Sequence, residues 1–111
     1  MGWERIAAVS EVTEGKTLKF QFERGGRTVD AFLARFQGRL VAYENQCRHL
    51  ALTLDYDDNR FFAADGQHFI CQNHGALYDP LTGLCLRGPC EGQRLKPLPI
   101  EVVGRMVWLV D

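Results

Sequence analysis

The sequence predicts a small all-β protein built from antiparallel strands. Hydrophobic and polar residues alternate with a period of two along residues 18–22, the pattern of a strand with one buried face. Turn-forming pairs such as Gly25-Gly26 and Gln37-Gly38 separate the extended runs at intervals of about eight to twelve residues. No stretch combines a sustained 3.6-residue period with helix caps. A single domain spanning residues 1–111 is therefore expected.

The first part of the chain is predicted to form a meander of neighbouring strands. The expected strands are residues 3–9, 18–22, 28–36 and 40–43. Gly25-Gly26 supplies the positive φ angles that a tight hairpin needs, and Gln37-Gly38 makes the next turn.

The second part is predicted to contain shorter strands and longer loops. Asp65-Gly66 lies between the extended runs 61–64 and 67–70, which indicates a hairpin. The acidic run 55–59 is expected to be a solvated turn, because it lacks the glycine and the late glutamate of a calcium loop. The later expected strands are residues 84–86 and the closing run 106–110, and the proline-interrupted run 95–103 suits an edge strand or a connection.

Composition limits the classes of partner. Hydrophobic residues make up 46% of the 111 residues and the net charge is −1. A charge so close to zero argues against nucleic acid or a membrane surface as the main partner, since both attract a basic face. With no signal peptide and no long apolar run in the sequence, we expect a soluble cytoplasmic protein. In that reducing compartment, cysteines more often ligate metals or stay reduced than form disulfides.

Two short runs pair a thiol with an imidazole: Cys47-Arg48-His49 and Cys71-Gln72-Asn73-His74. Thiolates and imidazoles are the ligands that iron–sulfur clusters and zinc prefer. Two cysteines and two histidines also make a good tetrahedral zinc site, although structural zinc sites usually pair like residues at close spacing. The mixture in each run instead suits a binuclear cluster in which one iron takes both thiolates and the other takes both imidazoles.

These runs, with the sequence from Gly75 to Asp79 and the pair Gly88-Pro89, resemble the Rieske 2Fe-2S domain family, in particular its small ferredoxin-type members. The resemblance implies a β-sandwich with an inserted cluster-binding subdomain at roughly residues 45–91. It implies that Cys47 and Cys71 hold the inner iron of one 2Fe-2S cluster and that His49 and His74 hold the outer iron. Gly75 would allow close packing of the backbone against the cluster, and Gly88-Pro89 would form a covering third loop.

The chain departs from the family pattern at several positions. Arg48 and Ala51 stand where many members have proline and glycine in the first loop. In high-potential relatives a serine and a tyrosine after the second motif donate hydrogen bonds to the cluster and a ligand thiolate. Ala76 cannot donate such a bond, whereas Tyr78 can, so we expect a potential below that of the respiratory type.

The resemblance implies an electron carrier rather than an enzyme. A Rieske ferredoxin would relay single electrons from a reductase to a terminal oxygenase or another redox enzyme, as a monomer in isolation. An oxygenase also needs an iron held by two histidines and a carboxylate, and His68 alone cannot supply them. The alternatives are a small subunit of a larger reductase, such as a nitrite reductase, and a structural zinc-binding module.

Two further features of the sequence bear on this function. Docking of redox partners is expected at the histidine tip, with Leu50, Leu77 and Pro89 as an apolar collar. The remaining cysteines, Cys85 and Cys90, could form a small disulfide loop or remain reduced, and we expect reduced thiols that do not ligate the cluster.

Overall fold

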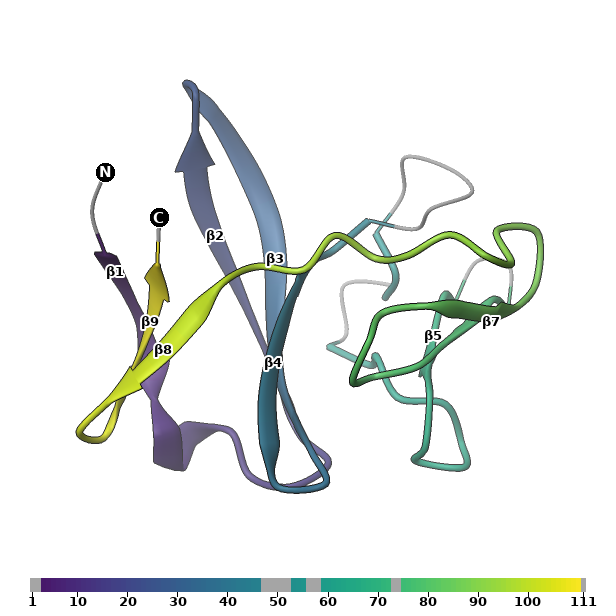
Figure 1. Cartoon of the computed structure of the whole chain (residues 1–111), viewed down its shortest axis with the longest axis horizontal. Helices are drawn as coiled ribbons and strands as arrows, with labels where there is room; N and C mark the ends of the chain where they lie inside the picture. The colour runs from purple at the N-terminus through teal and green to yellow at the C-terminus, as the bar shows by residue number, and fades with distance from the viewer. Residues whose placement is uncertain (1–2, 47–52, 56–58, 73–74, 111) are drawn as a thin grey trace.

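The computed structural model describes residues 3–46, 53–55, 59–72 and 75–110. Within these ranges the chain forms antiparallel strands and one short 3-10 helix, Val9–Glu11. The strands form three sheets of three strands each (Figure 1). The prediction of an all-β antiparallel protein is confirmed.

The central sheet is the predicted meander, in the order β2 (Thr17–Arg24), β3 (Arg27–Phe36) and β4 (Arg39–Glu44). Gly25 and Gly26 have φ angles of 56° and 80°, and Gln37 and Gly38 have 51° and 77°. Two successive positive φ angles give the turn geometry that matches the twist of a tight hairpin. The turn residues therefore fix the register of both strand pairs.

A second sheet pairs the two ends of the chain, in the order β1 (Trp3–Ala8), β9 (Met106–Val110) and β8 (Ile100–Val103). It lies beside the central sheet (Figure 1). The two sheets share a core of buried aliphatic and aromatic side chains: Ala7, Val12, Phe22, Ala31, Leu33, Ala42, Leu98, Val107 and Leu109. These sheets form the β-sandwich base of the molecule.

The third sheet is small and lies beyond β4, away from β8 and β9 (Figure 1). Its strands are β5 (Phe69–Ile70), β6 (Leu77–Tyr78) and β7 (Cys85–Arg87), in that order. Phe32 of β3 stacks on Phe61 with ring centroids 4.1 Å apart and meets Phe69 edge-on at 5.1 Å. Strands this short bury little by themselves, so aromatic packing against the base holds this sheet in place.

The structure corrects two local expectations and adds one strand that was not expected. Residues 61–64 do not form a strand, and their pairing is limited to an isolated bridge between Phe62 and Phe69. Sequence reasoning did not anticipate β6, because only its pairing with β5 and β7 makes these two residues a strand. Asp55, expected in a solvated turn, is 2% exposed. No helix in the described part of the chain has the length and apolarity needed to span a membrane.

Candidate metal centre

Cys71 directly follows β5 and begins the connection to β6, and its side chain is buried. Its N–H donates to the carbonyl of Ala76 at 2.9 Å, and its carbonyl accepts from the N–H of Gly75 at 2.8 Å. Gly75 has a φ angle of 71°, which L side chains rarely adopt. These bonds close the loop 72–75 at its base, so the Cys71 thiol is presented from a fixed backbone position.

The first loop leaves the central sheet at the end of β4. The Asn45 side-chain oxygen accepts a hydrogen bond from the N–H of Leu54 at 2.8 Å, across the segment 46–53. The carbonyl of Leu54 accepts a bond from the N–H of Gln72 at 2.7 Å. Leu54 therefore connects the start of the first loop to the residue that follows Cys71.

A buried carboxylate orients the Asn45 amide. Asp55 accepts from the Asn45 side-chain nitrogen at 3.1 Å and from the N–H of Asn59 at 2.9 Å, and it pairs with the Lys19 ammonium at 3.1 Å. Burial alone would raise the pKa of Asp55, but the bonds from Asn45 and Asn59 and the Lys19 charge outweigh it and lower the pKa. Lys19 belongs to β2, so this network links the base to the first loop.

The third loop, at Gly88-Pro89, packs closely on the end of the second loop, which begins at Cys71 and ends at Ala76. Gly88 has a φ angle of 111°, and a Cβ placed there would lie 2.9 Å from the Cα of Ala76. Only glycine permits this approach, and the small side chain of Ala76 contributes to it. The following Pro89 is exposed, whereas Cys90 is buried. The Gly88-Pro89 loop therefore covers the base of the loop that Cys71 begins.

Tyr78 points its hydroxyl at a sulfur of this third loop. Its oxygen lies 3.0 Å from the Cys90 Sγ, and the Cys90 Sγ lies 3.0 Å from that of Cys85. All three side chains are buried. Sequence reasoning considered Cys85 and Cys90 as a pair but did not place Tyr78 beside them.

Three of the four predicted ligands, Cys47, His49 and His74, lie outside the described residues, so the ligand set remains a prediction. The described ranges contain no cluster of three or more residues that could hold a metal ion. His68, the third histidine of the sequence, pairs its ring Nδ1 with the carboxylate of Asp65 at 2.8 Å.

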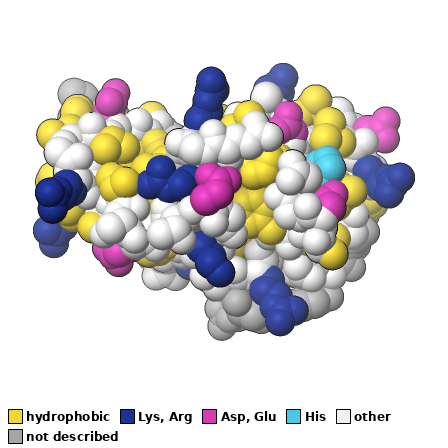
Figure 2. Space-filling view, turned by 90° about the horizontal axis from the view of Figure 1, so that it is seen from below, with side chains coloured by type: hydrophobic (Ala, Val, Ile, Leu, Met, Phe, Trp, Pro, Cys, Tyr) yellow, Lys and Arg dark blue, Asp and Glu magenta, His cyan; other side chains and the backbone are white. Residues whose placement is uncertain are grey.

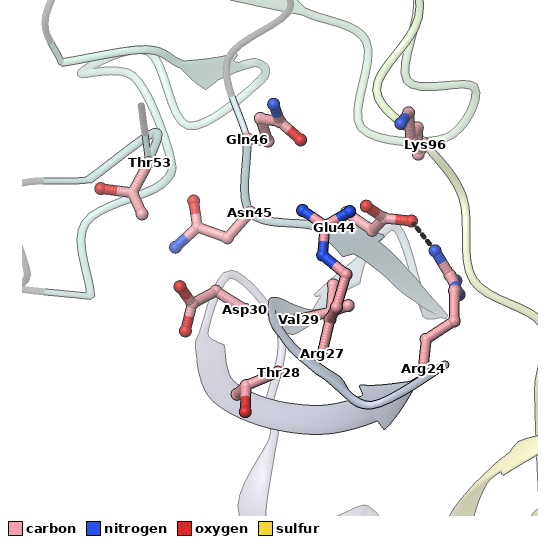
Figure 3. A pocket seen from close by; sticks show the side chains of 10 residues that line it. All are labelled: Arg24, Arg27, Thr28, Val29, Asp30, Glu44, Asn45, Gln46, Thr53 and Lys96. Carbon is pink, nitrogen blue, oxygen red and sulfur yellow. Dashed lines mark hydrogen bonds and ion pairs between the residues drawn. The ribbon is translucent and has the colours of Figure 1, made fainter. Parts of the chain in front are cut away.

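A polar cavity of about 320 Å³ lies beside the start of the first loop (Figure 3). Arg24 and Glu44 form an ion pair at 2.8 Å on its wall, and Arg27 and Lys96 also line it. None of its lining residues is a predicted ligand. Elsewhere on the surface, Figure 2 shows basic side chains scattered among acidic and hydrophobic ones on one face.

Comparison with known proteins decides the family. A family model for the Rieske [2Fe-2S] domain matches residues 2–104. This chain belongs to the Rieske family. No curated protein matches its sequence. The Rieske domain binds a [2Fe-2S] cluster, which the sequence pattern had predicted.

Solved structures show the same fold at low sequence identity. The ferredoxin of carbazole 1,9a-dioxygenase from Nocardioides aromaticivorans IC177 is 21% identical, with a TM-score of 0.73 over 98% of this chain and 97% of that one. A chain in a reduced oxygenase–ferredoxin complex of carbazole 1,9a-dioxygenase is 18% identical, with a TM-score of 0.79 over 96% of this chain. The present chain spans only 27% of that second chain.

The described residues fit a Rieske cluster. A buried thiol at the base of a hairpin loop is the donor type that iron in such clusters prefers. Ala76 and Gly88 keep side-chain bulk low where the second and third loops meet. The bonds through Leu54 hold the ends of the first loop next to the second. The frame therefore suits a group ligated from both loops.

Proposed function

We propose that this Rieske protein is a ferredoxin that carries single electrons from a reductase to a terminal oxygenase or another redox enzyme. The observation that carries this proposal is how much of a known ferredoxin chain this chain matches. The superposition covers 97% of the Nocardioides ferredoxin chain but only 27% of the longer chain in the oxygenase–ferredoxin complex. The match over nearly the whole of a ferredoxin chain supports a carrier.

The proposed ligands are Cys47 and Cys71 for one iron and His49 and His74 for the other. Support comes from the backbone frame, in which Leu54 bonds both to Asn45, two residues before Cys47, and to Gln72, directly after Cys71. When bound, the cluster accepts and releases one electron, and histidine ligation places its potential at about −150 to +300 mV.

Hydrogen bonding from the chain's own residues is expected to place the potential in the lower part of that range. Ala76 offers no side-chain donor at the position that directly follows Gly75. Donors to cluster sulfurs raise the potential because they stabilise the added negative charge. A potentiometric titration that gives a value near the upper limit would contradict this assignment.

Partner docking is proposed at the exposed end of the small sheet. Leu77 is half-buried and Pro89 is exposed there, and the third predicted collar residue, Leu50, lies outside the described residues. Replacing Leu77 with Glu should slow electron transfer to the partner at least several-fold without changing the visible spectrum. Val103→Glu is the matched control, because Val103 is 54% exposed on β8 at the far end of the base. Equal rates for both variants would place docking elsewhere.

A direct test of the proposed function is anaerobic purification followed by metal and sulfide analysis. A red-brown protein with two irons and two acid-labile sulfides per chain, whose visible absorption bleaches on one-electron reduction, is expected. A colourless protein with one zinc and no labile sulfide would refute the ferredoxin assignment and favour the zinc-binding alternative.

A further inference from the structure

Two cysteines outside the predicted ligand set lie in direct contact. The Sγ atoms of Cys85 and Cys90 are 3.0 Å apart, and both residues are 1% exposed. The backbone of Gln93 fixes this arrangement. Its carbonyl accepts from the Cys85 N–H at 2.7 Å, and its N–H donates to the Cys90 carbonyl at 2.9 Å. Backbone hydrogen bonds therefore hold the two cysteines next to each other.

The contacts around the pair define a chain of donors. Cys90 donates to the Cys85 sulfur, and Cys85 donates to the carbonyl of Arg87 at 3.3 Å. The Tyr78 hydroxyl also lies 3.0 Å from the Cys90 sulfur, which is outside the predicted ligand set.

We propose that Cys85 and Cys90 are an oxidative modification site, which a small peroxide converts reversibly into a disulfide. A disulfide bond has an S–S distance of about 2.05 Å, so the two sulfurs need approach by only about 1 Å. One sulfur attacks a peroxide oxygen, an S–O bond forms, the O–O bond breaks, and water leaves with the thiol proton. The second thiol then attacks the resulting sulfenic acid, an S–S bond forms, and the hydroxyl leaves as water.

The overall reaction balances. Two thiols and one hydrogen peroxide give one disulfide and two waters, so the sulfurs lose two electrons and the peroxide oxygens gain them. A dithiol reductant reverses the change by thiol–disulfide exchange.

Access to the pair requires only local opening. Gly88, Pro89, Glu91 and Gly92, which surround Cys90 in the chain, are all exposed. A surface turn of this kind opens more readily than the whole domain unfolds. Hydrogen peroxide, which is little larger than water, is small enough to use such openings.

Peptide mapping tests the disulfide directly. Trypsin cleaves after Arg87, between the two cysteines, so a disulfide would join peptides 61–87 and 88–94. We expect this linked pair after treatment of the cluster-containing protein with hydrogen peroxide, and its disappearance on addition of dithiothreitol. Cys85→Ser should prevent the linkage, which excludes a bond between Cys71 and Cys90. Full alkylation of both cysteines after peroxide, loss of cluster absorbance before any linkage, or persistence of the linkage in Cys85→Ser would overturn the proposal.

A zinc-bound protein would still form the linked peptides but contain no labile sulfide, which separates failure of this inference from failure of the proposed function.

Discussion

Asp55 should be among the most sensitive positions for stability, and Asp55→Asn tests this. The carboxylate is 2% exposed, accepts hydrogen bonds from Asn45 and Asn59 and pairs with Lys19. The substitution keeps the side-chain volume and one acceptor oxygen but removes the charge and turns an NH₂ group towards a donor. Loss of a charge-assisted hydrogen bond costs about 1.5–3 kcal/mol. The Lys19 side chain is 31% exposed and can turn towards water, so its pairing adds at most about 1 kcal/mol.

We therefore expect Asp55→Asn to lower the free energy of unfolding by about 2–3 kcal/mol at pH 7. With a typical dependence of about 1–3 kcal/mol per molar urea, the unfolding midpoint should fall by about 0.7–3 M. The assay is urea unfolding under anaerobic conditions, followed by far-ultraviolet circular dichroism and by visible absorbance of the cluster. Asp30→Asn is the matched control, because Asp30 is an exposed β3 carboxylate bonded to the Gln21 side chain. Its expected effect is within about 0.5 kcal/mol.

The effect of Asp55→Asn should also depend on pH in a defined direction. The pKa of Asp55 is lowered in the folded protein from its ordinary value of 3.8. A lowered folded pKa stabilises the protein fully above the ordinary value, and the contribution is lost as the pH falls through the folded pKa. The stability difference between the two proteins should thus be constant near neutral pH and shrink below about pH 4. A midpoint for Asp55→Asn that equals that of Asp30→Asn at pH 7 would refute the assignment.

Two other positions give sharp expectations. Gly88→Ala should lower the free energy of unfolding by about 1–3 kcal/mol, because the new Cβ would lie 2.9 Å from the Cα of Ala76. Gly92→Ala isolates the backbone strain, since Gly92 also has a positive φ but no atom within 4 Å of a Cβ, so equal losses in urea unfolding would exclude close packing as the cause. Tyr43→Phe should cost about 1 kcal/mol in the same assay, because it leaves the buried Pro80 carbonyl without the hydroxyl that bonds it at 2.8 Å. Burial, with a smaller contribution from a neighbouring carboxylate, raises the pKa of Tyr43 to about 12, so ultraviolet titration should show this phenol ionising only near that pH.

The base of the fold could be predicted from sequence because neighbouring residues determine its turns and strands. Gly25-Gly26 and Gln37-Gly38 specify hairpins by their own backbone preferences, and period-two alternation specifies which face is buried. The metal-binding family could be predicted for the same reason, since the type and spacing of the cysteines and histidines lie in two short runs. Both kinds of signal can be read without knowing any long-range contact.

The parts that escaped prediction depend on residues far apart in the chain. The acidic run at Asp55 suggested solvent exposure, and its burial depends on Lys19 and Asn45, which only the fold brings near. The contact from Tyr78 in β6 to Cys90 in the third loop likewise depends on the fold. The residues next to Asp55 in the sequence do not reveal that three donors surround its carboxylate in the fold.

The way the small sheet is attached determines which part of the molecule should open first. Its strands are two or three residues long, and it is held by the aromatic packing of Phe61 and Phe69 on Phe32 and by the polar bonds around Asp55. The base instead has long, continuous ladders and its own core. Regions with few ladder bonds open at a lower free energy than the whole domain. In native-state hydrogen exchange, the N–H of Ile70, which bonds the carbonyl of residue 61 at 2.8 Å, should therefore exchange faster than the ladder amides of β3. Asp55→Asn should speed exchange at Ile70 but not in β3, whereas an equal change in both would show that the two parts open as one unit.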